Sequence, residues 1–300
     1  MTAKFRHSRI FIGLSLGLSL MALIWPFPVP FTAQAAALAV LVALFGLPHG
    51  ALDPYLVRKA GWVRGKAGML LFLSAYIVLA AAAFGLWLMF PAIMLAVFLT
   101  VSFWHFSGDW QEGSAPRWIA LLAGLSVLSL PSFMHTGEVC RIFALLGNDE
   151  HGCAQARMLG LMGPYVMVAL NGGMAYALWR NRLGFHEASE IIAMQILAMV
   201  FSPLIFFILY FCGLHSPRHL IAALRGLEET DRRGAWRDIV LYTALPILGA
   251  GALWLYPGAF SLNEGNLIVL VFIGLFCLTM PHMILMETLR PKGMQGTQGT

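Results

Sequence analysis

Long apolar runs separated by short polar stretches occupy the chain from end to end. Nine such runs can be marked, at 9–25, 31–48, 67–90, 92–106, 117–133, 158–179, 188–214, 237–256 and 266–289. A helix needs about 20 apolar residues to cross the hydrocarbon core of a bilayer, and most of these runs reach or approach that length. The pattern predicts an all-α fold, a polytopic membrane helix bundle, with a very tight hairpin at Pro91 between the third and fourth runs.

The basic residues between the runs predict how the bundle lies in the membrane. Arg and Lys cluster before the first run, at 58–66, at 218–237 and after the last run, and such clusters favour the cytoplasmic side. Nine full spans would place the last two clusters outside. One segment between 92 and 157 should therefore not cross, and the proline-interrupted stretch 117–133 is our candidate. We expect about eight transmembrane helices with both termini in the cytoplasm, as a single integral membrane domain over 1–292 and a disordered tail over 293–300.

Composition excludes several classes of protein. Apolar residues make up 59% of the 300 residues and charged residues 11%, less than half of the roughly 25% of soluble domains. A soluble enzyme, a disordered chain and a nucleic-acid binder are therefore excluded. The four cysteines lack a CxxC spacing and indicate neither a zinc site nor a disulfide framework. The basic N-terminus resembles a signal peptide, but we interpret it as a retained first helix because no soluble domain follows.

Nine histidines carry the most information about function, because ionisable groups at membrane depth are costly. Four of them lie in polar or loop surroundings, where we expect solvated side chains: His7, His135, His151 and His186. The other five lie at or near the ends of apolar runs: His49, His105, His215, His219 and His282. In the eight-span topology, all five come to the cytoplasmic half of the membrane. Since Arg and Lys alone fixed that topology, the shared depth is independent support for one site.

The surroundings of these five histidines predict a metal site. Imidazole is a good ligand for iron, copper and zinc, and a ligand histidine needs an acceptor behind it that fixes its tautomer. Asp53 and Asp109 each stand four residues after a histidine, and Glu287 follows His282. Pro217 predicts that a helix begins between His215 and His219, with Ser216 as its N-cap. The alternative is that each histidine is a hydrogen-bonded core residue.

These motifs resemble the Brp/Blh family of membrane β-carotene 15,15′-dioxygenases. The matching signatures are His-Gly-Ala-Leu-Asp at 49–53, Trp-His-Phe at 104–106, His-Ser-Pro-Arg-His at 215–219 and Pro-His at 281–282. The resemblance extends from the second run to the ninth. It implies a non-haem Fe(II) enzyme of a bacterial inner membrane that uses O₂ to cleave the central 15,15′ double bond of β-carotene into two molecules of retinal.

The resemblance also implies roles for individual residues. The iron ligands would be His49, His105, His215 and His219, and Asp53, Asp109 and His282 would lie behind them or line the pocket. Aromatic residues beside the histidine motifs, namely Trp104, Phe106 and Tyr210, would line an apolar substrate pocket. The partners would be β-carotene, O₂ and the lipid bilayer, with hand-over of retinal to an opsin as a further possibility and no nucleic acid.

Two other functions stay open at this point. Another membrane iron oxygenase, of desaturase or hydroxylase type, would be expected to carry adjacent His-His pairs, and this sequence has none. A metal-binding transporter or assembly factor belongs to a different class. Transporters often show paired broken helices and internal repeats. Pro203 and Pro246 could break helices, but no repeat is found. Loss of orange colour in β-carotene-producing bacteria would separate the dioxygenase from the transporter or assembly factor.

Overall fold

The computed structural model describes residues 3–111, 115–147, 149–225, 227–255 and 263–289, and this part of the chain is helical with short connections. Apolar runs become helices in a bilayer because a helix satisfies its own backbone hydrogen bonds. The elements are α1 (Ala3–Ile24), α2 (Phe31–Leu41), η1 (Val42–Gly46), η2 (Leu47–Leu52), α3 (Asp53–Lys59), α4 (Gly65–Met89), α5 (Pro91–Gln111), α6 (Arg117–Met134), α7 (Thr136–Gly147), α8 (Glu150–Trp179), α9 (Phe185–Val200), α10 (Pro203–Tyr210), η3 (Phe211–His215), α11 (Ser216–Leu224), α12 (Glu229–Leu255) and α13 (Glu264–Leu289). The predicted tail over 293–300 lies outside the described residues.

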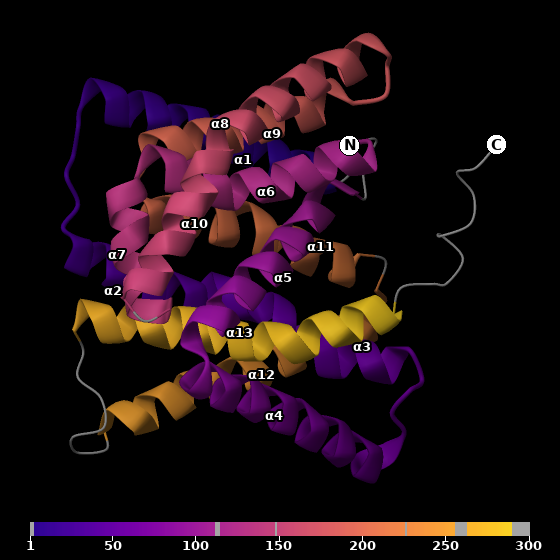
Figure 1. Ribbon diagram of the computed structural model, residues 1–300. Helices are drawn as coiled ribbons and strands as arrows, with labels where there is room; N and C mark the ends of the chain where they lie inside the picture. Colours follow the sequence, from indigo (N-terminus) through magenta and orange to yellow (C-terminus); the bar gives the residue numbers. More distant parts are fainter. Residues whose placement is uncertain (1–2, 112–114, 148, 226, 256–262, 290–300) are drawn as a thin grey trace.

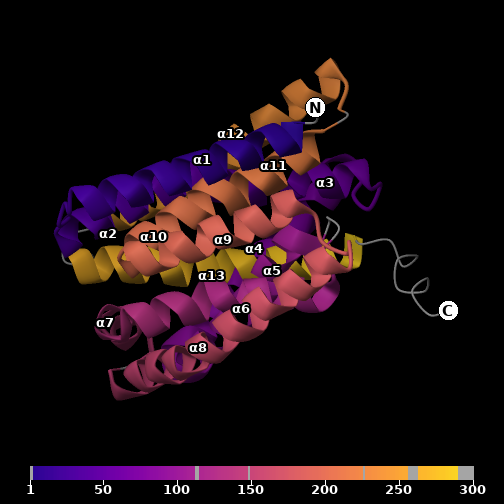
Figure 2. The same ribbon diagram turned by 90° about the horizontal axis from the view of Figure 1, so that it is seen from above.

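The helices form one bundle, and its described part begins and ends at the same end (Figure 1). Figure 2 shows the start of α1 and the end of α13 at that end, with α7 at the opposite one. Among the described residues, eight helical stretches are long and apolar enough to cross a membrane: Arg6–Ile24, Phe31–Lys59, Gly65–Met89, Pro91–Gln111, Arg117–Met134, Glu150–Trp179, Pro203–Leu224 and Glu264–Leu289. The prediction of a membrane bundle with about eight spans is confirmed.

The choice of 117–133 as the segment that does not cross is wrong. This stretch forms α6, one of the eight candidate spans, and Pro131 is accommodated inside the helix near its end. α6 packs tightly on α5 because Gly124 has no side chain: a Cβ there would lie 2.7 Å from the backbone oxygen of Phe103. Small residues at such contacts let membrane helices approach closely.

The run 188–214, which was predicted as one segment, forms two helices. α9 ends at Val200 and α10 begins at Pro203. The residue before a proline is disfavoured in helical conformation, and Ser202 has φ −54° and ψ 153°. The chain reverses here, since Glu190 near the start of α9 pairs with Arg218 of α11. The run therefore folds as two antiparallel helices, and the second of them, continued by η3 and α11, is one of the eight candidate spans.

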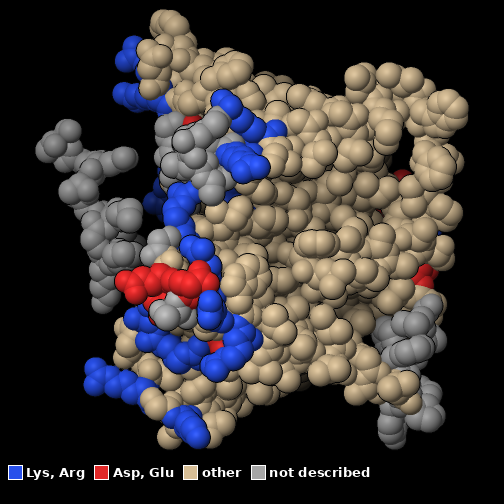
Figure 3. Space-filling model, turned by 180° about the vertical axis from the view of Figure 1, so that it is seen from behind, with Lys and Arg blue, Asp and Glu red and all other residues tan. Residues whose placement is uncertain are grey.

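The basic side chains lie at the end of the bundle where α1 begins. Figure 3 shows Lys and Arg gathered at that end, beside a broad surface with few charged side chains. The exposed residues of this group include Lys59, Arg64, Lys66, Arg225, Arg232, Arg233 and Arg237. A basic end and an apolar belt are the distribution expected of a multi-pass membrane protein.

Cys140 and Cys153 form a disulfide that joins α7 to α8. The prediction of no disulfide is therefore wrong for these two residues, whereas Cys212 and Cys277 are free. The cause is local: α7 folds back along α8, which brings cysteines 13 positions apart in sequence together. The bridge lies at the end of the bundle opposite the basic residues (Figure 2).

Candidate metal centre

Five histidines from different parts of the chain converge in the half of the bundle nearer the basic end. They are His49 of η2, His105 of α5, His215 of η3, His219 of α11 and His282 of α13. Their ring centroids are close: His105 and His215 are 4.6 Å apart, and His49 lies 5.4 Å from His215 and 5.5 Å from His282. The shared depth inferred from the sequence corresponds to one cluster.

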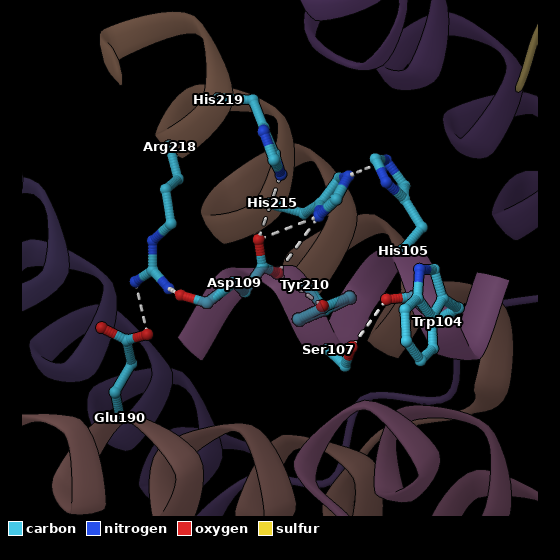
Figure 4. Close-up of polar contacts among 9 residues, drawn as sticks. All are labelled: Trp104, His105, Ser107, Asp109, Glu190, Tyr210, His215, Arg218 and His219. Atoms are coloured by element: carbon cyan, nitrogen blue, oxygen red, sulfur yellow. Dashed lines mark hydrogen bonds and ion pairs between the residues drawn. The ribbon is translucent and has the colours of Figure 1, made fainter. Parts of the chain in front are cut away.

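The cluster contains two sets of three histidines that could hold a metal ion. One set is His49, His105 and His282, and the other is His105, His215 and His219; within each set the ligand atoms lie within 4.8 Å of one another. His105 belongs to both sets, and its Nε2 is 3.0 Å from Nε2 of His215 (Figure 4). The two sets are therefore parts of a single centre.

Irregular helical turns place His49. The chain passes from α2 through a π-helical turn, η1, into a 3₁₀ turn that contains Pro48. Such turns leave backbone carbonyls without their regular helical partners, and π turns are frequent at functional sites. The carbonyl of Gly46 accepts from Nδ1 of His49 at 2.6 Å. Because Nδ1 of His49 is hydrogen-bonded to the backbone, Nε2 is the ring nitrogen that is available to bind a metal.

A second π-helical turn, η3, places His215 and His219. In a regular helix Pro217 would clash with the carbonyl of Gly213 and offer it no N–H. The wider turn avoids the clash, and Nε2 of His7 donates to this carbonyl at 3.0 Å. α11 begins at Ser216 with Pro217 in its first turn, as predicted, but it follows η3 without a break in the helical backbone. The expectation that His7 is simply solvated is wrong, because its ring is tied to the backbone. Ser216 caps no helix, since its hydroxyl donates to the carbonyl oxygens of Phe45 and Gly46.

Asp109 lies behind the histidines of η3 and α11. Its carboxylate is 3.1 Å from Nδ1 of His215 and 3.4 Å from Nε2 of His219, and it accepts from the hydroxyl of Tyr210 at 2.6 Å (Figure 4). We call Tyr210, Asp109 and His215 the core triad, because all three side chains are buried. The triad fixes His215 so that its Nε2 turns toward His105.

Asp53 stands in the same relation to His282. Its carboxylate accepts from Nδ1 of His282 at 2.8 Å and from the hydroxyl of Tyr76 at 3.1 Å, and the Tyr76 hydroxyl is also 3.2 Å from the carbonyl of Leu278. We call Tyr76, Asp53 and His282 the cavity triad. Nε2 of His282 is buried and has no hydrogen-bond partner in the described part of the chain. Such an atom has the position and free lone pair of a metal ligand.

The aspartates therefore serve histidines other than those the sequence spacing indicated. We expected Asp53 to support His49 and Asp109 to support His105, four residues earlier in each case. The structure instead joins Asp109 of α5 to His215 and Asp53 of α3 to His282. Helix crossings in space, which a spacing of four does not encode, decide these partners. Glu287, expected beside His282, instead accepts from the indole N–H of Trp104 at 3.2 Å.

A buried ionic chain supports the core triad from behind. Arg218 donates to the backbone oxygen of Asp109 at 2.6 Å and forms an ion pair with Glu190 (Figure 4). Glu190 also accepts from the hydroxyl of Ser8. These contacts join α1, α5, α9 and α11. Arg218, Glu190 and Tyr76 were not predicted as site residues; the signal for the first two in the sequence is an Arg and a Glu next to or inside apolar runs.

An apolar cavity of about 240 Å³ opens beside the histidines. His49, His105 and His282 line one part of it, and aromatic side chains line another. Of the three aromatic residues predicted for a pocket, Phe106 lines the cavity. Trp104 is directed to Glu287 and Tyr210 to Asp109 instead. The remaining aromatic lining comes from Tyr76, Phe98, Phe207, Phe211 and Tyr242.

The donors suit a borderline transition metal. The cluster offers five imidazole donors, three of them next to a carboxylate, and imidazole is a ligand that iron, copper and zinc prefer. The unpaired Nε2 of His282 is a buried polar atom that an ion would satisfy. The histidine clusters therefore fit a bound metal beside an apolar chamber.

Comparisons with known proteins agree with this site. The profile of the β-carotene 15,15′-dioxygenase family matches residues 40–290, a range that contains all five histidines. The chain is also similar to a β-carotene 15,15′-dioxygenase from an uncultured marine bacterium, 66A03, with 31% identity over 258 residues that cover 82% of this chain and 90% of the relative. No solved structure matches. The extent of both matches shows that the chain belongs to the β-carotene 15,15′-dioxygenase family.

Proposed function

We propose that this protein is a membrane dioxygenase that cleaves the central 15,15′ double bond of β-carotene with O₂ to give two molecules of retinal. One observation carries the proposal: a histidine cluster fit for a metal opens into an apolar cavity inside the membrane bundle. The family to which the chain belongs supports the same reaction. Both atoms of O₂ enter the products, so no external reductant is required.

The metal that we propose is Fe(II), held by His49, His105, His215 and His219, with His282 added to these predicted ligands. The support for adding His282 is its Asp53 partner and its unpaired Nε2. Iron bound by these residues would supply the activation of O₂. The remaining contribution belongs to the chain: the triads hold the imidazole rings in orientation, and the apolar walls keep water away.

The apolar character of the cavity walls matches that of the polyene. β-Carotene is a rigid hydrocarbon that offers no hydrogen bond, and the lining contains mainly apolar and aromatic side chains. Phe106, Phe207 and Phe211 form one wall next to His49 and His105. Flat rings of this kind pack well against a conjugated chain. The cavity therefore selects for an apolar substrate placed beside the metal centre.

We infer that the protein lies in a bacterial inner membrane with its basic end in the cytoplasm. The basic side chains at one end and the disulfide at the other support this orientation. O₂ and β-carotene both reach the site through the lipid bilayer. Hand-over of retinal to an opsin stays a prediction from the resemblance, and no described contact supports it.

Expression in bacteria that accumulate β-carotene tests the reaction. Loss of the orange colour together with retinal, identified by chromatography, is the expected result, and labelled oxygen from ¹⁸O₂ should appear in the product. Long apocarotenals in place of retinal would contradict central cleavage. Intact carotenoid beside a metal-loaded protein would contradict the enzyme altogether.

Removal and return of the metal tests the cofactor. Treatment of the purified protein with an Fe(II) chelator should abolish retinal formation, and Fe(II) should restore it. Recovery with Zn(II) instead of Fe(II) would contradict the assignment of iron.

A further inference from the structure

The elements that line the cavity differ in how deeply they are packed within the bundle. η2, α5 and α13 provide the three histidines that line the cavity, and α5 and α13 pack in the core of the bundle. Two further helices contribute to the lining: α4 provides Leu73, Tyr76 and Ile77, and α12 provides Tyr242, Leu245 and Pro246. These two helices are the lipid-facing side of the cavity.

Two lining residues face the outside of the protein as well as the cavity. Ile77 of α4 is 67% exposed and Leu245 of α12 is 54% exposed. A side chain that borders a cavity and is also exposed marks the place where the cavity reaches the surface. The mouth of the cavity therefore lies between α4 and α12.

The packing of these two helices explains why they leave a mouth. α4 packs against α13 and α5, whereas α12 packs against η2 and α3, and in the described part of the chain the two make little direct contact with each other. Among the residues whose burial the structure describes, the buried ones of α12 end at Ile239 and those of α4 begin at Ala83. The stretches beside the cavity thus have no partner helix between them.

The mouth lies within the hydrocarbon layer of a membrane. The sequence contains no charged residue from 67 to 89 in α4 or from 239 to 255 in α12. Charged side chains that face lipid at this depth would be costly, and their absence fits contact with acyl chains. An apolar molecule dissolved in the bilayer therefore meets the mouth directly, without passing through water.

We propose that β-carotene enters the enzyme sideways from the bilayer, between Ile77 of α4 and Leu245 of α12. This proposal rests on the proposed function, because that function identifies the occupant as a polyene. The mouth leads to His49 and His282 past Tyr76, which lines the cavity and is anchored to Asp53 and Leu278. The part of the polyene that the cavity does not hold extends back through the mouth into the lipid.

Four tryptophan substitutions test the mouth. Ile77→Trp and Leu245→Trp place a bulky ring in it, whereas Val78→Trp and Leu248→Trp add the same ring at positions that are 66% and 67% exposed and do not line the cavity. Each variant is purified with its iron content measured and then placed in phosphatidylcholine vesicles that contain β-carotene. The readouts are the initial rate of retinal formation and the amount of β-carotene that stays bound to protein purified from carotenoid-containing membranes.

Blocking the mouth should lower both readouts at least about 10-fold in Ile77→Trp and Leu245→Trp, with iron unchanged, while the two controls stay within about 2-fold of the parent. Equal behaviour of all four variants would overturn the proposed entry site. The bound-carotenoid readout separates the two hypotheses. If the parent binds β-carotene but forms no retinal, the proposed function fails, and the difference in binding between mouth and control variants still decides the entry site.

Discussion

The core triad and the cavity triad have the same chemistry but different surroundings. Tyr210, Asp109 and His215 are enclosed by protein on every side and tied through Arg218 to α1 and α9. Tyr76, by contrast, belongs to the lipid-facing helix α4 and borders the cavity. In both triads the aspartate binds Nδ1 of the histidine, and Nε2 of the histidine points toward the metal centre.

This difference teaches how one site can be both rigid and accessible. A centre enclosed entirely by packing like that of the core triad would orient a metal but exclude a long substrate. A centre built entirely like the cavity triad would admit lipid and water. The core triad therefore fixes the ion, and the cavity triad forms the side on which the substrate arrives.

Removal of a ligand from either triad should have the largest effect. We expect His215→Ala and His282→Ala each to lose most of the bound iron and to lower retinal formation by more than about 100-fold, beyond the loss typical of a residue behind a ligand. Elemental analysis and product chromatography measure this, with the exposed His151→Ala as the control. If His282→Ala retains its iron while His215→Ala does not, the two triads are not equivalent at the metal.

Breaking the ionic support of the core triad should mainly affect stability. Arg218→Ala leaves Glu190 buried without its partner, a change that typically costs about 3–5 kcal/mol. Arg225→Ala, an exposed position at the end of the same helix, should stay within about 0.5 kcal/mol. Thermal unfolding in detergent compares the two variants. Equal unfolding temperatures would mean that the ionic chain contributes nothing to the rigidity of the core triad.

Mutation of either aspartate should weaken iron binding, but to a different extent. Asp109→Asn and Asp53→Asn should each weaken iron binding by about 10- to 100-fold, because an amide can present its N–H₂ group to Nδ1 and favour the wrong tautomer. Asp109 contacts two histidines and Asp53 one, so the larger loss is expected for Asp109→Asn. Competition with a chelator of known affinity measures it. A larger loss in Asp53→Asn would reverse the roles of the two triads.

The tyrosine hydroxyls should give the smallest effects. Tyr210→Phe removes a buried hydrogen bond to a carboxylate, which costs about 1.5–3 kcal/mol of stability, whereas Tyr76→Phe should cost about 0.5–1.5 kcal/mol. Because Tyr76 also lines the cavity, its variant should change the KM for β-carotene, and Tyr210→Phe should not. Unfolding and steady-state kinetics test both parts. A KM change confined to Tyr210→Phe would contradict the division between the triads.

Much of this arrangement could be predicted from the order of residues alone. Charges between apolar runs predicted the bundle and the common depth of His49, His105 and His282, because membrane depth depends on position along the chain. The partners of the aspartates depend on which helices cross, and a spacing of four misled us at Asp53 and Asp109. Tyr76 stands in the middle of an apolar run. From the sequence alone, a tyrosine there whose hydroxyl binds a carboxylate cannot be told from one whose ring only packs against its neighbours.

The apolar run 188–214 shows a second limit of sequence reasoning. Hydropathy measures how apolar a run is, and it reports two consecutive helices of a hairpin as one long segment when the turn between them is also apolar. Phe201, Ser202 and Pro203 form such a turn. The proline was visible in the sequence, yet membrane helices also tolerate proline, as α6 does at Pro131. The ion pair between Glu190 and Arg218 shows in the structure that the chain reverses.

The π-helical turn at Phe211–His215 has a consequence for insertions and deletions in this chain. Such a turn holds one residue more than a regular helical turn. Loss of a single codon there would restore an unbroken helix and rotate everything after it by about 100° relative to α10. His219 and Arg218 would then leave the centre together, and Pro217 would meet the carbonyl from which the wider turn had separated it. A one-residue deletion at this point is therefore a more severe lesion than any single substitution in the same turn.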